Sequence, residues 1–397
     1  MERIRSLFTL RNYAVFLLVL FCIHYIPIET RTGVGWLKVM AMGTCPIVLL
    51  WKTPNISKAG IIIMTYFFCA LTFALFHYQT FRASTVFFLL SFLILYWTFY
   101  NLITIEHVFS LGYFVKIIKW LILVYTIVLI IQQLFLLVGI KLFPPINLCQ
   151  ILNRGIGANS LTYEPSTAAR MMGVFFYAYL KCNEYLKGEP IDFLSLFHGE
   201  HKWVTAGFLW SMLTMGSGTA FICLIVLSFY FIQRKYLVYI APLFLIVYFL
   251  LPYSQNESLQ RAVNVIDATM TFDAEEIKRT DSSAASRLNP MINTLTKLDL
   301  SDIETWFGHG IDYGHRIGGG LSSQSVVGEI GDYGLIVYLL GLLLVFSCSI
   351  KFFSIPTIMY FIGIGGGTAN IAYLWGILMV FMCVRYFSDY NYSNEQA

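Results

Sequence analysis

Long apolar runs, separated by short polar turns, extend along most of the chain. A helix needs about 20 apolar residues to cross the hydrocarbon core of a bilayer. Runs of that kind predict about twelve membrane-spanning helices, near residues 12–28, 34–51, 60–78, 84–103, 112–140, 164–183, 201–215, 218–233, 235–252, 324–350, 353–366 and 369–387. The predicted fold is therefore an all-α polytopic membrane protein, with residues 1–397 forming a single membrane domain.

Two longer connections interrupt this pattern, at about 141–163 and 253–323. The second is rich in charged residues, so we expect it to be solvated. Helical apolar spacing in "SLQRAVNVIDATMTF" and "SSAASRLNPMINTLTKL" predicts short helices within it, with a boundary or kink at Pro290. Residues 253–323 are thus predicted to be a long, partly helical loop over one face of the membrane domain.

Lysine and arginine in the short loops predict which side of the membrane each loop occupies. One set of loops holds most of these cations, namely Arg3, Arg5, Arg11, Lys52, Lys58, Lys116, Lys119, Lys181, Lys187, Lys202, Arg234, Lys235, Lys351 and Arg385. The short loops of the other set hold few, chiefly Arg31 and Arg82. Since cationic loops stay in the cytoplasm, both termini are predicted to be cytoplasmic and both long connections external.

Composition supports a membrane protein, because 58% of the residues are hydrophobic and only 12% are charged. A soluble domain of this length needs more surface charge. The chain has no phosphate-binding Gly-Lys-Ser/Thr loop, no dinucleotide fingerprint and no His-x-Glu or Cys-x-x-Cys spacing. We therefore expect no metal, no cofactor and no nucleic acid partner. The Gly-rich "GIGGGTAN" (363–370) joins two apolar runs and is interpreted as close helix packing or a tight turn.

Arginines accumulate on the predicted external side: Arg82, Arg154, Arg170, Arg261, Arg279, Arg287 and Arg316. Guanidinium groups bind phosphate oxygens in bidentate fashion, and positive charge stabilises a departing diphosphate. Some of these arginines are expected to be ordinary loop charges. Arg170 differs, because a helix that starts at Pro165 places it more than one turn inside an apolar run. It either faces a polar cavity or extends to the outer interface.

Carboxylates and histidines on the same side are candidates for a general base: Glu164, His309, Asp312, His315 and Glu329. Glu164 directly precedes the predicted helix start. Its carboxylate could cap the helix N-terminus or accept a proton from a substrate hydroxyl. Glu329 opens the apolar run after the long loop and has the same two alternatives.

The segment "SRLNPMINTLTKLDLSDIETWFGHGIDYG" (286–314) resembles the Wzy-type O-antigen polymerase and O-antigen ligase superfamily. In that family an arginine opens a loop helix and a Gly-x-Gly follows. Here Arg287 and "GHG" (308–310) take these positions. The number of spans and the late external loop also resemble the family.

Two further segments carry the same resemblance. In "SSQSVVGEIGDYGLIVYLLGLLL", Glu329, Gly331 and Gly334 match the start of the family's next span. "TYEPSTAAR" (162–170) resembles a Glu-Pro-Ser segment at the outer start of a middle span. These motifs are short, and together with the topology they cover the length of the chain.

The resemblance implies a C-type membrane glycosyltransferase that uses undecaprenyl-diphosphate-linked glycans at the external face of the bacterial inner membrane. It implies Arg287 as a diphosphate contact, with Arg154 and Arg170 as further contacts. Arg82 and Arg316 join this group as external arginines. Membrane lipids and a copolymerase that regulates chain length are the other partners implied.

The chain departs from the ligases of the family in one respect. Ligases present a His-Asn pair just ahead of the span after the loop, but "GGGLSSQS" (318–325) contains no histidine. We therefore expect a polymerase of O-antigen, capsule or exopolysaccharide repeat units, with His309, Glu164 or Glu329 as the base. One alternative is a ligase that transfers glycan to a lipid A core. The other is a transporter or flippase of an amphipathic anion, which predicts inverted repeats that are not evident in the sequence.

Overall fold

The computed structural model of the chain describes residues 9–23, 35–140, 156–231, 273–280, 298–311, 328–364 and 372–394, with residues 264, 267, 268, 270, 271 and 313. These residues form helices and turns, and no strand occurs among them. The observed fold class is thus all-α, as the sequence predicts.

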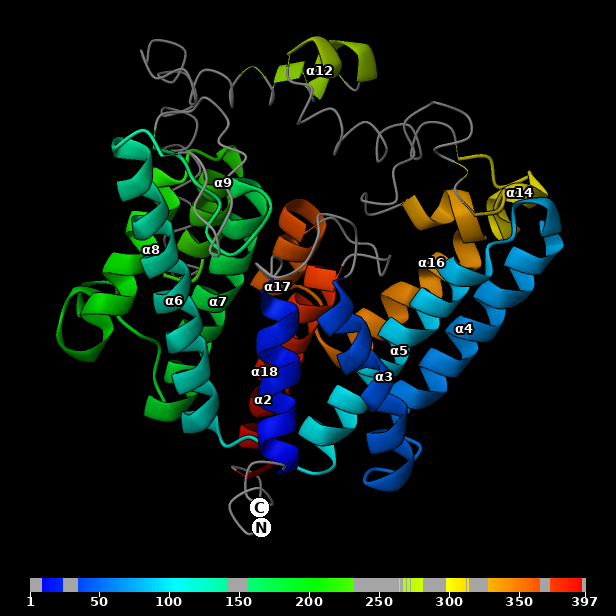
Figure 1. Cartoon of the computed structure of the whole chain (residues 1–397), viewed down its shortest axis with the longest axis horizontal. Coiled ribbons are helices and arrows are strands. Elements are labelled where there is room, and N and C mark those ends of the chain that lie inside the picture. The colour runs from blue at the N-terminus through cyan, green and yellow to red at the C-terminus, as the bar shows by residue number, and fades with distance from the viewer. Residues whose placement is uncertain are drawn as a thin grey trace.

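The helices are long where the apolar runs are long (Figure 1). They are α2 (Leu10–Cys22), α3 (Trp36–Trp51), α4 (Lys58–Phe76), α5 (Ala83–Thr104), α6 (Leu111–Leu137), α7 (Pro165–Lys187), α8 (Lys202–Thr214), α9 (Gly218–Ser228), α12 (Ala274–Thr280), α14 (Ile303–Phe307), α16 (Gly328–Cys348), α17 (Ile355–Ile358) and α18 (Ala372–Asn394). Short helical turns are η1 (Tyr78–Thr80), η2 (Leu194–Phe197), η3 (Gly199–His201) and η6 (Met359–Ile364).

Four helices of the described chain are long and apolar enough to cross a membrane: α4, α5, α6 and Ile330–Cys348 of α16. Apolar but shorter helices are α2, α3 and α9. A helix lies at each predicted span except 235–252, which falls outside the described residues. The described part of the chain is therefore all-helical with apolar membrane-spanning candidates, and the number twelve stays a prediction. Most of the 253–323 loop also falls outside the described residues, although α12 and α14 are helices within it.

Helix α18 lies in the middle of the bundle and separates α6–α9 from α3–α5 and α16 (Figure 1). It packs against α2, α5 and α7. Every residue from 372 to 384 is buried, and the ring of Trp375 stacks on Phe92 with centroids 5.7 Å apart. A helix that is apolar on all sides is expected to be buried in this way.

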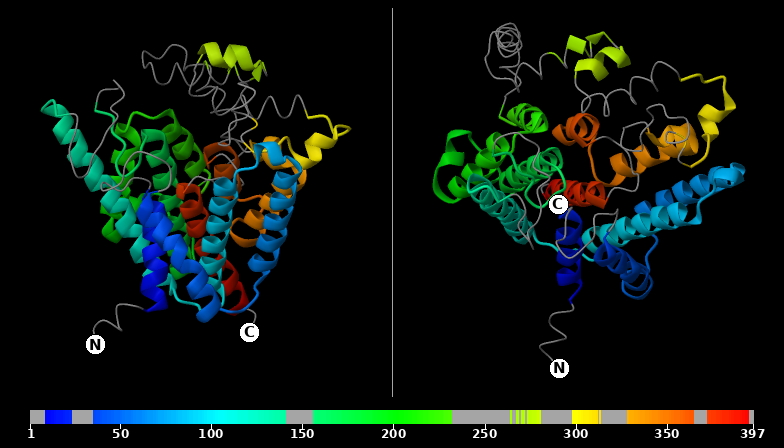
Figure 2. Two further views of the ribbon diagram at one scale, coloured as in Figure 1. Left: turned by 45° about the vertical axis from the view of Figure 1, so that its right-hand side comes forward. Right: turned by 45° about the horizontal axis from the view of Figure 1, so that its top comes forward.

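The start of α2 and the end of α18 lie at one end of the bundle, opposite α12 and α14 (Figures 1 and 2). Arg11 Nε donates a hydrogen bond to the Val108 carbonyl at 3.2 Å. Tyr386 OH lies 2.8 Å from His107 Nδ1 in the same connection between α5 and α6. Both ends of the described chain thus meet one loop, which is the arrangement that the loop cations predict. Which side of a membrane this end faces stays a prediction.

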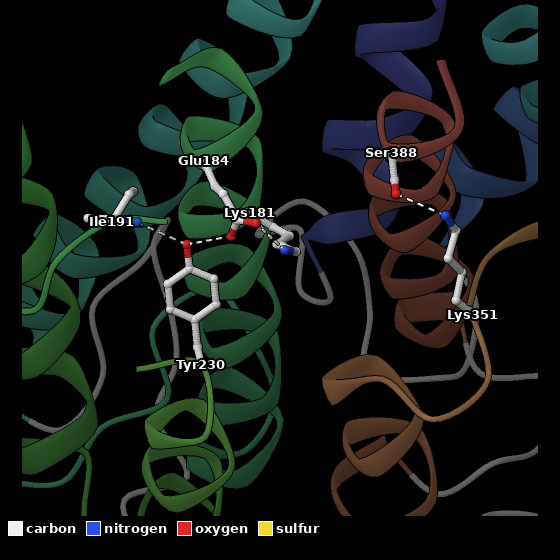
Figure 3. A network of polar contacts seen from close by, with 6 residues as sticks. All are labelled: Lys181, Glu184, Ile191, Tyr230, Lys351 and Ser388. Carbon is white, nitrogen blue, oxygen red and sulfur yellow. Dashed lines mark hydrogen bonds and ion pairs between the residues drawn. The ribbon is translucent and has the colours of Figure 1, made fainter. Parts of the chain in front are cut away.

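Polar contacts link the helices near this end of the bundle (Figure 3). Tyr230 OH donates to Glu184 Oε2 at 2.8 Å and accepts from the Ile191 backbone N–H at 3.4 Å. Lys351 Nζ donates to Ser388 Oγ at 2.9 Å. These bonds tie the end of α9 to α7 and the connection after α16 to α18.

His201, just ahead of α8, is a buried histidine at the end of the bundle where α7 terminates. Its Nδ1 lies 2.8 Å from Tyr179 OH, and its Nε2 lies 3.0 Å from Lys187 Nζ. Burial lowers the pKa of His201, and the charges of Lys187 and, more weakly, Lys119 lower it further, while Glu200 opposes them.

We expect the protein to lose stability as the pH falls below about 6.5, the ordinary pKa of histidine. In that range the unfolded chain binds a proton at this residue that the folded chain excludes, so the free energy of unfolding decreases with falling pH. Thermal unfolding in detergent at several pH values measures the effect. His201→Gln should flatten the dependence, and an equally steep dependence in both proteins would contradict this origin.

Candidate active site

The described residues include four of the predicted site side chains: Arg82, Glu164, Arg170 and His309. Glu329 is described only as part of the α16 backbone. Arg154, Arg287 and Arg316 lie outside the described residues, as do Asp312 and His315.

Arg170 lies in the second turn of α7, which begins at Pro165 as the sequence predicts. At about 1.5 Å per residue, it is roughly 25 Å along the helix from Lys187. Its Nη1 donates to Tyr373 OH of α18 at 2.9 Å. Its Nε is buried and makes no hydrogen bond within the described part of the chain. The guanidinium group therefore points toward the central helix, which agrees with the inward-facing alternative and not with extension to the interface.

Glu164 occupies the N-cap position of α7, but its carboxylate does not cap the helix. The carboxylate instead accepts a hydrogen bond from Ser166 Oγ at 3.1 Å. The Glu164 backbone carbonyl accepts from Thr162 Oγ1 at 2.7 Å. The capping alternative for this side chain is wrong, because its carboxylate accepts no hydrogen bond from a backbone N–H of the first turn of α7.

A buried polar loop, residues 157–163, leads into α7. Ser160 Oγ donates to the Tyr125 carbonyl at 2.6 Å, and its backbone exchanges two hydrogen bonds with the Gln132 amide, at 3.0 and 2.8 Å. Tyr125 lies roughly 18 Å before the end of α6. The loop thus descends beside α6 toward the level of Arg170. Sequence reasoning missed it, although the Gln132–Gln133 pair inside an apolar run was a signal.

Two of the three segments that carry the family resemblance, "GHG" (308–310) and "GEIGDYG" (328–334), lie against each other. The backbone N–H of His309 donates to the Gly331 carbonyl at 2.9 Å, and that of Gly310 donates to the Asp332 carbonyl at 3.2 Å. We call residues 306–310 and 331–334 the glycine clasp. It joins the end of the long loop to the start of α16 by main-chain hydrogen bonds.

Glycine is required on both sides of the glycine clasp. Gly308 and Gly334 have φ values of +82° and +85°, which L side chains rarely adopt. A Cβ at Gly308 would lie 2.4 Å from the Asp332 carbonyl oxygen, and one at Gly334 would lie 2.2 Å from that of Trp306. Because these neighbours are main-chain atoms, neither segment of the clasp can make room for a Cβ without moving the other segment.

Gly334→Ala is therefore expected to open the glycine clasp. The backbone strain costs on the order of 1–3 kcal/mol, and the carbonyl contact adds to it. Hydrogen exchange of residues 306–310 should increase, and the unfolding temperature in detergent should fall. Gly43→Ala in α3 is the matched control, since a Cβ there meets no atom within 4 Å. Equal exchange in both variants would contradict the clasp.

The glycine clasp packs against the C-terminal end of α4. The ring of Phe307 packs edge-on against Phe73, with centroids 4.9 Å apart. A Cβ at Gly310 would lie 2.3 Å from Thr80 Oγ1 in η1. Arg82 follows two residues later as the exposed N-cap of α5, so it belongs to the same corner of the molecule.

His309 is the candidate base that this corner orients. Its Nδ1 lies 2.5 Å from Glu304 Oε2, and its ring stacks on Tyr313 with centroids 4.0 Å apart. The backbone N–H of Tyr313 donates to Asp332 Oδ1 at 3.1 Å. The histidine side chain is 24% exposed, so it is shielded yet reachable from solvent. Sequence reasoning missed Glu304, Tyr313 and Asp332, which only the folded loop brings together.

The described candidates form two groups. Arg170 and Glu164 lie on α7, whereas His309 and Arg82 lie beside α14 and α4, on the other side of α18 (Figure 1). Among the described residues, no group of three or more His, Cys, Asp or Glu could hold a metal ion. One group contains a histidine–carboxylate pair, and the other contains a half-buried arginine.

No protein-family model, no curated protein and no solved structure matches the chain.

Proposed function

We propose that the protein is a membrane glycosyltransferase that polymerises undecaprenyl-diphosphate-linked repeat units. The observation that carries the proposal is the glycine clasp. Two segments that resemble the polymerase and ligase superfamily, "GHG" and "GEIGDYG", are paired through their backbones, and the pairing presents His309 at the outer end. The contact supports the proposal because both segments contribute to one site.

The proposed reaction moves the growing glycan from its lipid carrier onto an incoming lipid-linked repeat unit. The acceptor hydroxyl oxygen bonds to the anomeric carbon, and the bond from that carbon to the diphosphate oxygen breaks. The electron pair leaves with the undecaprenyl diphosphate, and the hydroxyl proton passes to a base. His309 is the favoured base because a carboxylate orients it, and Glu164 and Glu329 are the alternatives.

Arginine side chains stabilise the departing diphosphate in this proposal. Arg170 has a buried Nε that makes no hydrogen bond within the described chain, while Tyr373 holds its Nη1. Because Arg170 lies across α18 from His309, it serves this role together with Glu164 at the start of the same helix. Positive charge held in place before the reaction stabilises charge that develops as the bond breaks. Arg82, Arg154, Arg287 and Arg316 are the other proposed contacts.

The finer topology belongs to the same proposal. Twelve spans with both termini cytoplasmic place the glycine clasp and the start of α7 at the external face of the bacterial inner membrane. Membrane lipids surround the bundle, and a copolymerase that regulates chain length is a further proposed partner. The polymer is O-antigen, capsule or exopolysaccharide.

Reconstitution tests the proposal against its two rivals. Purified protein in lipid vesicles is supplied with lipid-linked repeat units extracted from the cells that make it, without any lipid A core. Polymerisation gives a ladder of lengthening glycans on a gel. A ligase gives longer products only after core acceptor is added, and a transporter redistributes the units across the bilayer without changing their length. Empty vesicles are the control.

A further inference from the structure

Glu304 meets the ring of His309 at a position set by the local fold. Asp302 is the N-cap of α14, and its Oδ1 accepts from the Glu304 backbone N–H at 3.0 Å. This cap fixes the first turn of α14, from which the Glu304 carboxylate reaches His309 Nδ1 at 2.5 Å.

The imidazole of His309 is held by Tyr313 and by the 331–334 half of the glycine clasp. Tyr313 stacks on the ring at an interplanar angle of 13°, and Tyr313 is itself bonded through its backbone to Asp332. The His309 backbone N–H is bonded to Gly331. The backbone hydrogen bond to Gly331 therefore fixes the position of the His309 ring, and the contact with Glu304 fixes its rotation.

We propose that Glu304 is a positioning residue for His309, an inference that rests on the proposed function. The carboxylate keeps the ring proton on Nδ1, so the lone pair is on Nε2. Nε2 takes the proton of the acceptor hydroxyl as the new glycosidic bond forms and the diphosphate departs. The resulting imidazolium is stabilised by the Glu304 carboxylate until the proton passes to water. This is the division of work between a carboxylate and a histidine that hydrolytic triads use.

A surface ion pair is the simpler account of the same contact, because the Glu304 side chain is 53% exposed. Exposed pairs contribute little to stability. Under that account, removing the carboxylate leaves both turnover and the histidine tautomer unchanged. The two accounts therefore differ in what Glu304→Gln and Glu304→Ala do.

The test combines kinetics with nitrogen NMR. In the vesicle assay, Glu304→Gln should lower kcat by about 10- to 100-fold, with little change in the KM for lipid-linked repeats. Glu275→Gln on α12, another exposed glutamate of the long loop, should match the wild type. With ¹⁵N-labelled histidine in the full-length protein, His309 should be the Nδ1–H tautomer in the wild type and shift to Nε2–H in Glu304→Ala. His309→Gln identifies its signal.

Failure of this inference is distinguishable from failure of the proposed function. Wild-type kcat in Glu304→Gln, in a protein that does polymerise, overturns the role of Glu304 alone. An Nε2–H tautomer in the wild type also overturns it. A wild-type protein that elongates no repeat units overturns the proposed function, and the catalytic role of Glu304 with it.

Discussion

His309→Gln is expected to slow polymer growth by about 10²- to 10⁴-fold, the usual contribution of a general base. Glutamine approximates the shape of the ring but cannot take up a proton. The ring is fixed by Glu304, by Tyr313 and by the backbone of the glycine clasp. The loss should therefore be in kcat, because the substitution removes the proton acceptor and not a binding group.

The matched control for this variant is His198→Gln. His198 is exposed in the η2–η3 connection, away from the glycine clasp. Its variant should elongate repeat units at the wild-type rate. Unfolding temperatures of both proteins show whether His309→Gln is folded. Full activity in a folded His309→Gln protein would transfer the role of base to Glu164 or Glu329.

Arg170→Gln is expected to lower kcat/KM for lipid-linked repeats by about 10²-fold, the effect of removing one preorganised electrostatic contact from a transition state. The substituted glutamine keeps a polar group near Tyr373 but has no charge to offer the diphosphate. Arg170→Lys should lose less, because the charge stays while the fork that can hold two phosphate oxygens is lost. Elongation at limiting substrate measures both.

Two further variants define what Arg170 does. Tyr373→Phe removes the hydrogen bond to Nη1 and should give a smaller loss than Arg170→Gln. Arg279→Gln on α12, an exposed arginine of the same predicted side, should leave kcat/KM unchanged. An equal loss in Arg279→Gln would mean that general positive charge attracts the substrate. Wild-type kcat/KM in Arg170→Gln would limit Arg170 to a structural role.

The long helices could be predicted from the sequence because one physical constraint decides them, namely the length of apolar helix needed to cross a bilayer. Runs at 60–78, 84–103 and 112–140 became α4, α5 and α6 with ends shifted by a few residues. The start of α7 followed from Pro165, whose fixed φ suits the first helical position. Helix α18 is as long, and its apolar composition predicts burial, but which three helices cover it could not be predicted from its composition.

The candidate site was less predictable, because its contacts join residues far apart in the chain. The motif glycines suggested tight turns, yet nothing in the sequence pairs Gly308 with residue 334. The role of Gly334 as a break inside α16, with φ +85°, appears only when Trp306 is placed beside it. Glu304 is one of many loop carboxylates until α14 turns it onto His309. Local patterns predict elements, whereas this site depends on contact between elements.

The most direct test of glycan polymerisation counts both products of the same reaction. Vesicles containing the purified protein are given lipid-linked repeat units extracted from the producing cells, and glycosidic bonds formed and undecaprenyl diphosphate released are measured together. The account predicts one diphosphate lipid released for each repeat unit added, with no core acceptor present and with both signals strongly reduced in His309→Gln. Units that cross the bilayer with neither elongation nor diphosphate release would contradict it.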